Sequence, residues 1–494
     1  MNAGPSAEGS GLNDPRPAAD SAHAGPSSPM PPSGASAAGD QQPAAVSFWT
    51  ALAFWLKLGC ISFGGPAGQI AIMHAELVER RRWISERRFL HALNYCMVLP
   101  GPEAQQLATY IGWLMHRKWG GIVAGGLFVL PSLFVLIALS WIYLRFGDVP
   151  VIAGIFYGIK PAVTALVVHA AFRLGSRALR NRVMAAIALA SFIAIFVFAV
   201  PFPVIVIAAA VIGIAGARWA PAWFAPPAAA SHGAAGSTLD GSGAAAPARA
   251  LIDDDTPTPA HARASRAQML RVLMVGILVW GAAFGALAAW AGLHGTLTQM
   301  AAFFSKAALI TFGGAYAVLP YVYQAAVDQF HWATATQMID GLALGESTPG
   351  PLIMVVAFVG FVGGWTHAVL GPDALFAGGA VAASVVTFFT FLPSFIFILA
   401  GGPLIEATHG RLAFTAPLSA ISAAVVGVIA TLACFFAYHV FWPQGLAGHI
   451  DAVAVVIALL AAIALFRFKV GVVALLAVCG ALGVLATWAL PLLG

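Results

Sequence analysis

The sequence predicts an all-α integral membrane protein made of two homologous halves. Its 494 residues are 60% hydrophobic and only 9% Asp, Glu, Lys or Arg, whereas a typical soluble domain carries about 25% charged residues. Apolar runs recur from Trp49 to the C-terminus, and a bilayer crossing needs about 20 helical residues. Several motifs also occur twice. We expect about 10 to 13 crossings, some of them formed by broken or re-entrant helices.

Two stretches rich in Ala, Gly, Pro and Ser divide the chain. Residues 1–46 contain one basic residue, Arg16, and no apolar signal-peptide core, so we expect a disordered tail. A similar composition at 218–268 predicts a solvated cytoplasmic linker. The membrane-embedded parts are then a first repeat at 47–217, a connecting transmembrane helix at 269–292 and a second repeat at 293–494.

Four motifs of the first half recur 249 residues later. The pairs are Lys57 with Lys306, Phe63–Gly65 with Phe312–Gly314, Trp83 with Trp332, and Pro100–Pro102 with Pro349–Pro351. A fifth pair, Leu130–Ser132 with Leu392–Ser394, is 262 residues apart, which indicates a short loop insertion in the second half. Matches at a fixed offset indicate two structurally equivalent repeats.

The loop charges indicate that the two halves face opposite ways. The loop at 79–88 holds five arginines, while the equivalent loop at 328–337 holds no Lys or Arg. Because Lys and Arg in short loops mark the cytoplasmic side, we expect the first loop inside and the second outside. The connecting helix supplies the odd crossing that inverts the second half. The sequence therefore predicts inverted repeats, as in many secondary transporters.

Each half has two Gly- and Pro-containing breaks inside apolar segments. Proline lacks the amide donor and glycine is unfavourable in a helix, so these motifs interrupt it. Half-helix N-termini at such breaks attract anions, and matched breaks in two repeats indicate a transport site. A packing kink is the alternative for any single motif. The backbone positions assigned to the site are Gly64, Gly65, Pro100, Gly101, Pro102, Gly313, Gly314, Pro349, Gly350 and Pro351.

Charged residues near the breaks are further candidates. Lys57 and Lys306 each lie about two helical turns before a Gly-Gly motif, where a positive charge would face an anion. Snorkelling to the membrane surface is the alternative. Glu103 and Glu346 flank the Pro-Gly-Pro motifs, and either would pair with a lysine or carry a coupling proton. Lys160 is a weaker candidate, because the second half has no equivalent lysine.

Neutral polar residues complete the expected binding site. Ser62, Thr311 and Thr348 would donate hydrogen bonds to an oxyanion, although such residues also bridge packed helices. The same holds for Gln105, Gln106 and Ser347.

Other classes of site have no support in the sequence. It contains no HExxH, GxSxG or P-loop motif, and no GxGxxG placed after a strand. The histidines and cysteines have no metal-ligand spacing. We therefore expect no catalytic residues, metal or cofactor. The net charge of +5 comes from clusters between apolar runs, which favours a topology signal over nucleic-acid binding. Trp83 and Trp332 are expected to be membrane-interface anchors.

Three motifs carry a family resemblance. They are Phe54–Gly59 continuing into Ser62–Pro66, then Leu99–Ala104, and then Gly345–Ile353. In these motifs the chain resembles the chromate ion transporter family in its long, two-domain form. The resemblance covers about residues 47–218 and 270–494.

The resemblance implies a multi-pass protein of the bacterial inner membrane that exports chromate and confers chromate resistance. Sulfate has the same shape and charge, so sulfate or another oxyanion is the alternative cargo. A membrane-embedded enzyme that acts on a lipid phosphate with Glu103 or Glu346 as base is a remote alternative. The expected partners are chromate, the lipid bilayer and a second copy of the chain in a homodimer, with no nucleic acid.

Overall fold

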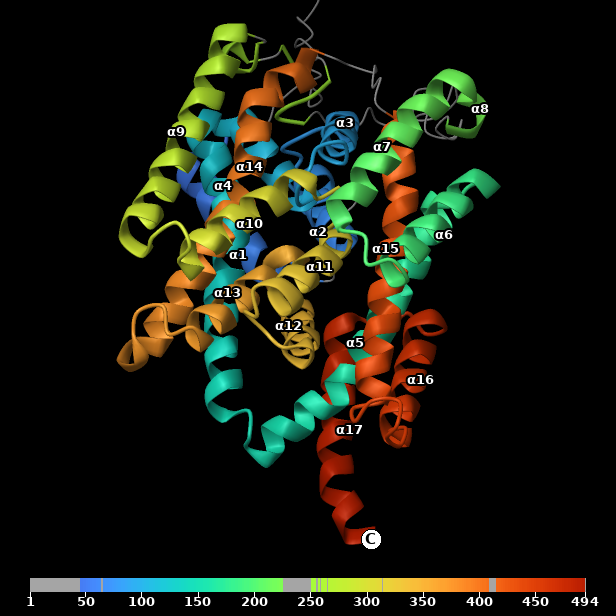
Figure 1. Cartoon of the computed structure of the whole chain (residues 1–494). Coiled ribbons are helices and arrows are strands. Elements are labelled where there is room, and N and C mark those ends of the chain that lie inside the picture. Colours follow the sequence, from blue (N-terminus) through green and yellow to red (C-terminus); the bar gives the residue numbers. More distant parts are fainter. Residues whose placement is uncertain are drawn as a thin grey trace, which may run out of the picture. The chain divides into compact units, whose positions relative to one another are not determined.

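The structure is a computed structural model, and it describes residues 45–63, 65–224, 250–254, 256–257, 259–263, 265–312, 314–407 and 415–493. These residues are helical, apart from turns and one isolated β-bridge between Ile84 and Ile252 (Figure 1). In the described part of the chain, six helices are long and apolar enough to cross a membrane. The predicted all-α membrane fold is therefore confirmed. The total of 10 to 13 crossings stays a prediction.

The first repeat runs from α1 to α7. Its elements are α1 (Phe48–Ile61), α2 (Gly65–His74), the π-helix η1 (Ala75–Arg80), α3 (Glu86–Cys96), α4 (Glu103–Phe146), α5 (Pro150–Ala178), α6 (Arg182–Phe196) and α7 (Phe202–Trp219). The short α8 (Pro221–Phe224), the 3₁₀ turn η4 (Ala260–Ala262) and α9 (Arg266–Ala291) follow. The last of these lies where the sequence predicts the connecting transmembrane helix.

The second repeat runs from α10 to α17. Its elements are α10 (Thr296–Ile310), α11 (Ala315–Tyr323), the π-helix η5 (Gln324–Gln329), α12 (Ala335–Ser347), the 3₁₀ turn η6 (Leu352–Met354), α13 (Val355–Thr366), the 3₁₀ turn η7 (Pro372–Ala374), α14 (Leu375–Ala407), α15 (Thr415–Phe441), α16 (Ala452–Phe466) and α17 (Val472–Leu493).

The backbones of the two halves share even their irregularities. The π-helix η1 recurs as η5 at the 249-residue offset. Each is followed by a non-glycine residue with positive φ, Arg82 at 52° and His331 at 53°. Both features are rare in helical proteins, so their recurrence supports a common origin for the halves. The inverted orientation of the halves in the membrane stays a prediction.

Helix α4 turns back on itself. His116 and Arg117 have non-helical dihedral angles, so α4 is two helices joined at a kink. A Cβ added at Gly112 would lie 2.4 Å from the carbonyl oxygen of Gly120, which shows how closely the two arms approach. The equivalent arms of the second repeat are α13 and α14, which also pack together. The arm that begins at Glu103 is therefore a half-helix.

The C-terminal helices of the two repeats are exchanged. Helices α6 and α7 of the first repeat pack on α15 of the second, while α16 and α17 pack on α5 of the first. Helices α5 and α15 also pack against each other, as Figure 1 shows. Each repeat therefore completes the core of the other, and neither forms its helical packing alone.

A short segment before α9 contacts the loop between η1 and α3. The amide groups of Leu251 and Ile252 donate hydrogen bonds to the carbonyls of Arg82 and Trp83, at 2.9 and 3.1 Å. The Ser85 hydroxyl donates to Asp254 at 2.7 Å. We call residues 250–254 and 256–257 the strap. Part of the expected linker thus holds the arginine-rich loop of the first repeat.

The expected interface tryptophans are instead buried. Trp83 is 5% exposed and Trp332 is 1% exposed. Trp83 contacts the ring of Phe54 at 4.8 Å, and Trp332 stacks on Phe330 at 4.5 Å. The anchor prediction was wrong, because both rings belong to the buried hydrophobic core and pack against its aromatic side chains.

Candidate functional site

Two equivalent hydrogen bonds join the breaks of one repeat to the breaks of the other. The amide of Gly101 donates to the carbonyl of Thr311 at 2.8 Å, and the amide of Gly350 donates to the carbonyl of Ser62 at 2.7 Å. Gly101 corresponds to Gly350, and Ser62 to Thr311. A reciprocal pair of contacts is what a two-fold relation between the repeats produces. The four breaks therefore meet at one centre.

The two Pro-Gly-Pro glycines are fixed by their backbone and by their neighbours. Gly101 has φ of 122° and Gly350 has φ of 109°, a region that favours glycine. A Cβ at Gly101 would lie 2.3 Å from the Ser394 hydroxyl, and one at Gly350 would lie 2.8 Å from the Ser132 Cβ. Both serine hydroxyls are buried, without a hydrogen-bond partner in the described chain. These serines recur at the 262-residue offset.

Four helix starts surround a small cavity at this centre. It is lined by Pro66 and Gln69 of α2, residues 102–104 at the start of α4, Ala315 at the start of α11, and residues 351–353 at the start of η6 and α13. Two of these starts belong to each repeat. Helix N-termini carry free amide groups and a partial positive charge. The arrangement suits an anion.

The helix starts at the cavity lack capping side chains. The N-cap residues that precede α4, α11 and η6 are Pro102, Gly314 and Pro351, and none of them makes a side-chain cap. By contrast, Ser85 and Thr334 cap α3 and α12, because their hydroxyl groups accept hydrogen bonds from backbone amides of the first helical turn. These two helices lead into the Pro-Gly-Pro breaks. Amide groups at the cavity are therefore left for another acceptor.

The cavity is nearly closed. Its volume is about 10 Å³, which is about the room that one water molecule needs. A tetrahedral oxyanion does not fit without a movement of the helices. Among the lining residues, only Glu103 carries a formal charge, and its buried Oε2 atom has no hydrogen-bond partner in the described chain.

Gln69 is the second polar side chain of the lining. It is fully buried, its amide group donates to the Gly350 carbonyl, and its Oε1 atom has no partner among the described residues. Sequence reasoning missed Gln69, because it lies inside α2, four residues after the glycine pair that marked the break. Helix periodicity from Gly65 would have found it, since residues four apart share a face.

The expected lysines lie apart from the cavity. Lys57 on α1 and Lys306 on α10 are both exposed, at equivalent positions, and neither lines the cavity. The hydroxyls of Ser62 and Thr311 donate back to Leu58 and Ala307 of their own helices, both at 2.6 Å. In this conformation the positive potential of the cavity therefore comes from helix ends.

The remaining expected residues surround this centre. Thr348 donates to the Gly345 carbonyl at 3.0 Å, and buried Glu346 accepts a hydrogen bond from Tyr316. The Pro100 carbonyl accepts from Gln106 at 2.8 Å. Gly65 and Gly314 both have positive φ where α2 and α11 begin. Pro349 lies in the second Pro-Gly-Pro break, while Gly64 and Gly313 lie outside the described residues.

A partly buried ion pair joins the two repeats outside the cavity. Lys160 of α5 lies 3.5 Å from Asp340 of α12, and the Tyr143 hydroxyl donates to the same carboxylate at 2.8 Å. Asp340 is 1% exposed. The repeat does not indicate this pairing, because the residue equivalent to Asp340 is His91.

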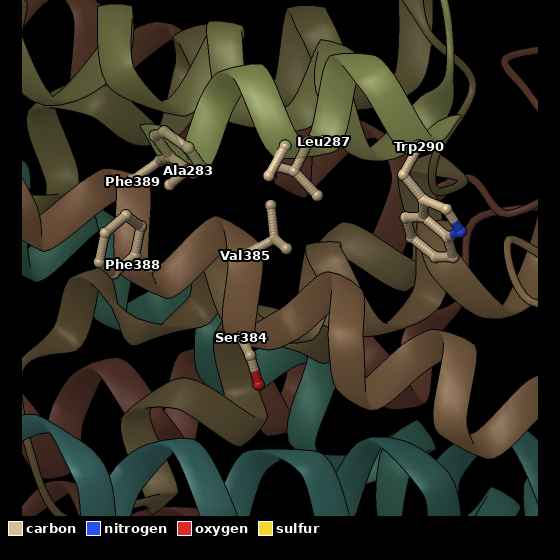
Figure 2. Close-up of a pocket in the computed structure, with 8 residues that line it drawn as sticks. Ala283, Leu287, Trp290, Ser384, Val385, Phe388 and Phe389 are labelled. Carbon is tan, nitrogen blue, oxygen red and sulfur yellow. The ribbon is translucent and has the colours of Figure 1, made fainter. Parts of the chain in front are cut away.

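A larger groove lies elsewhere. It has a volume of about 490 Å³ and runs between α9 and α14. Figure 2 shows Leu287 of α9 facing Val385 of α14, with Trp290 at one end of the groove and Phe388 at the other. Ser384 is the one polar side chain of the lining, and no charged residue contributes. Such a surface suits lipid chains rather than an oxyanion. Among the described residues, no His, Cys, Asp and Glu side chains cluster as metal ligands.

Comparison with known proteins gives one consistent family. The family model described as "Chromate transporter" matches residues 49–214 and 298–484. A chromate transport protein of Pseudomonas aeruginosa is 33% identical over 390 residues, 78% of this chain and 80% of that protein. Another, of Cupriavidus metallidurans, is 27% identical over 81% of this chain and 86% of its own length. A probable chromate transport protein of Synechococcus elongatus is 26% identical over 72% of this chain and 76% of its own. No solved structure matches.

Proposed function

Since the chain belongs to the chromate transporter family, in its long two-domain form, we propose that it exports chromate across the bacterial inner membrane and so confers chromate resistance. The family consists of transporters, so the chain is not an enzyme, and the lipid-phosphate hypothesis falls. The observation that carries the proposal is the convergence of four helix N-termini, two from each repeat, on one cavity.

We assign the oxyanion to this cavity. The free amides that begin at Glu103 and Leu352 would donate to its oxygens, because they have no acceptor within their own helices. Gly65, Gly101, Gly314 and Gly350 would let the backbone approach it closely. The hydroxyls of Ser62, Thr311 and Thr348 donate to backbone carbonyls and would donate to the anion instead when the helices move.

Transport requires the cavity to open alternately to each side, because its present volume excludes an oxyanion. The crossing hydrogen bonds at Gly101 and Gly350 are exchanged by the two-fold relation of the repeats. Both repeats could therefore tilt while these bonds hold the breaks together. The inverted orientation of the repeats makes the inward- and outward-open forms equivalent.

The membrane potential favours export. An interior-negative potential contributes about 2.3 kcal/mol per charge per 100 mV, so a dianion that leaves the cell gains about 4.6 kcal/mol at that potential. Export of the dianion alone therefore needs no coupled ion.

The proposal is tested by uptake of radiolabelled chromate into everted vesicles that contain the protein. We expect chromate to accumulate above its external concentration, beyond the level in empty-vector vesicles, and we expect this accumulation to be lost when the voltage is collapsed. Excess sulfate added outside distinguishes the cargoes, because full competition would make sulfate a cargo of the same site. Absence of chromate uptake by well-inserted protein would overturn the proposal.

The role of the lysines has its own test. Lys57→Ala and Lys306→Ala proteins are expected to take up chromate more slowly if these charges attract the anion during the cycle. Wild-type rates at equal insertion would remove both residues from the site.

A further inference from the structure

The cavity at the crossing of the repeats holds one carboxyl group. Glu103 is the first residue of α4, and its side chain enters the space that the four helix starts enclose. A Cβ at Gly314, where α11 of the other repeat begins, would lie 3.9 Å from Glu103 Oε1. The carboxyl group thus spans from its own helix start toward the start of α11.

The position is one that an anion would take. A carboxylate is stabilised at helix N-termini, and Glu103 stands among several. Its Oε2 atom is buried and without a partner in the described chain, as is the Oε1 atom of Gln69 in the same lining. The site therefore already contains an anionic group of the chain, with acceptor atoms that a proton or a donor would satisfy.

Only the first repeat has a carboxyl group at this position of the cavity lining. The residue equivalent to Glu103 is Leu352, which lines the same cavity. The backbone needs no acid at this position, since the second repeat builds the same helix start without one. The other groups that face Glu103 are uncharged: Gln69 from α2, Ala315 from α11, Leu352 from η6, and the Cys96 thiol, which interacts with Glu103 from α3.

We propose that Glu103 is an internal competitor of the transported oxyanion, so that the oxyanion binds only when this carboxyl has taken up a proton. The proposal rests on the proposed function. An ionised carboxylate and a dianion repel each other in a space this small. A protonated carboxyl instead donates its O–H to an oxyanion oxygen. The proton comes from the aqueous phase and leaves when the oxyanion does.

The test is chromate binding by the full-length protein in lipid nanodiscs, measured over a range of pH around neutrality. Anion and proton binding are linked reciprocally. Once Glu103 is ionised, the affinity of the wild type is expected to fall by up to about tenfold per pH unit, relative to Glu103→Gln at the same pH. Because both affinities are measured at the same pH, their ratio is not affected by the protonation of chromate itself.

Glu103→Asp keeps a titratable group and is expected to keep a pH dependence. Asp340→Asn removes a buried carboxyl that lies outside the cavity, and its pH dependence should match the wild type. If the ratio of the chromate affinities of the wild type and Glu103→Gln does not change with pH, the proposal is overturned.

A second measurement covers the case in which Glu103→Gln does not fold. When chromate is added to the wild type in weakly buffered solution, the protein should take up about one proton from solution for each anion that binds. A pH indicator measures this uptake. Chromate binding without proton uptake would contradict the role of Glu103 and leave the transport proposal intact. A wild type that neither binds nor moves chromate would overturn both.

Discussion

The two repeats build the same backbone at the cavity and fill it with different side chains. Pro102 and Pro351 precede equivalent helix starts, and Pro66 has its counterpart in Ala315. Where the first repeat has Glu103 and Gln69, the second has Leu352 and Val318. The comparison separates two properties: the symmetric backbone creates an anion site, and the asymmetric side chains set the conditions under which it fills.

The surface loops differ in the same sense. In the first repeat, Arg80 and Arg81 contact Glu76 at 2.5 and 3.5 Å. Burial opposes the charge of Glu76, but the two arginines outweigh it and lower its pKa. The strap also pairs with this loop. The equivalent loop of the second repeat has no Lys or Arg and no such strap among the described residues. The side-chain differences between the repeats are therefore concentrated at the cavity and in the surface loops.

The largest effect is expected where the repeats are most alike. Gly101→Ala and Gly350→Ala should each destabilise the protein by more than about 2 kcal/mol, because both the positive φ and the opposite serine exclude a Cβ. Thermal unfolding in detergent and vesicle uptake measure this. Gly281→Ala in α9, where a Cβ meets no neighbour, is the control and should retain wild-type stability. Unequal effects at the two glycines would weaken the claim of a symmetric centre.

The next effect tests the asymmetry at the cavity. Leu352→Glu places a second carboxyl opposite Glu103 and should reduce chromate uptake more than tenfold, since two like charges about 4 Å apart repel by about 4 kcal/mol at an effective dielectric constant of about 20. Leu352→Gln is the matched control, with the same shape and no charge, and should retain more uptake. Equal uptake by the two variants would show that charge at this position is unimportant.

An intermediate effect is expected at the ion pair between the repeats. Lys160→Met leaves the buried Asp340 carboxylate unpaired and should cost about 2 to 3 kcal/mol, less than for a fully enclosed pair because Lys160 keeps 27% of its side chain exposed. Thermal unfolding in detergent measures this loss of stability. The double variant Lys160→Met with Asp340→Asn should recover part of the loss, and no recovery would mean that the charge is not what destabilises the single variant.

The smallest effect compares the two capped loops. Ser85→Ala and Thr334→Ala each lose a helix cap worth about 1 kcal/mol. Only Ser85 also bonds the strap, through Asp254. Ser85→Ala should therefore speed limited trypsin cleavage after Arg263, while Thr334→Ala should not. Equal cleavage rates would mean that this bond does not hold the strap.

The breaks and the repeat were predictable because glycine and proline act through the local backbone. Gly101 and Pro102 interrupt a helix in any surroundings, and their recurrence at one offset reveals the second half. Which side of each helix packs against the core was not predictable in this way. Many of these segments are apolar on all sides, so the sequence does not indicate which side of α1 or α10 faces the core. Lys57 and Lys306 were therefore expected at the site, while the structure exposes both.

Pairings between distant polar residues were also beyond the sequence. Lys160 and Asp340 belong to different repeats and have no equivalents that pair, so no internal symmetry points to them. The strap lies in a stretch whose composition predicts solvated chain, and it is held by backbone hydrogen bonds that any sequence can make.

Inverted repeats that meet at one anion site are the central claim, and the sidedness of two equivalent loops tests it most directly. In a variant without native cysteines, Arg82→Cys and His331→Cys would be labelled in whole cells by a membrane-impermeant thiol reagent. The account predicts that Cys at 331 reacts in intact cells and that Cys at 82 reacts only after permeabilisation. Labelling of both positions from the same side would contradict it.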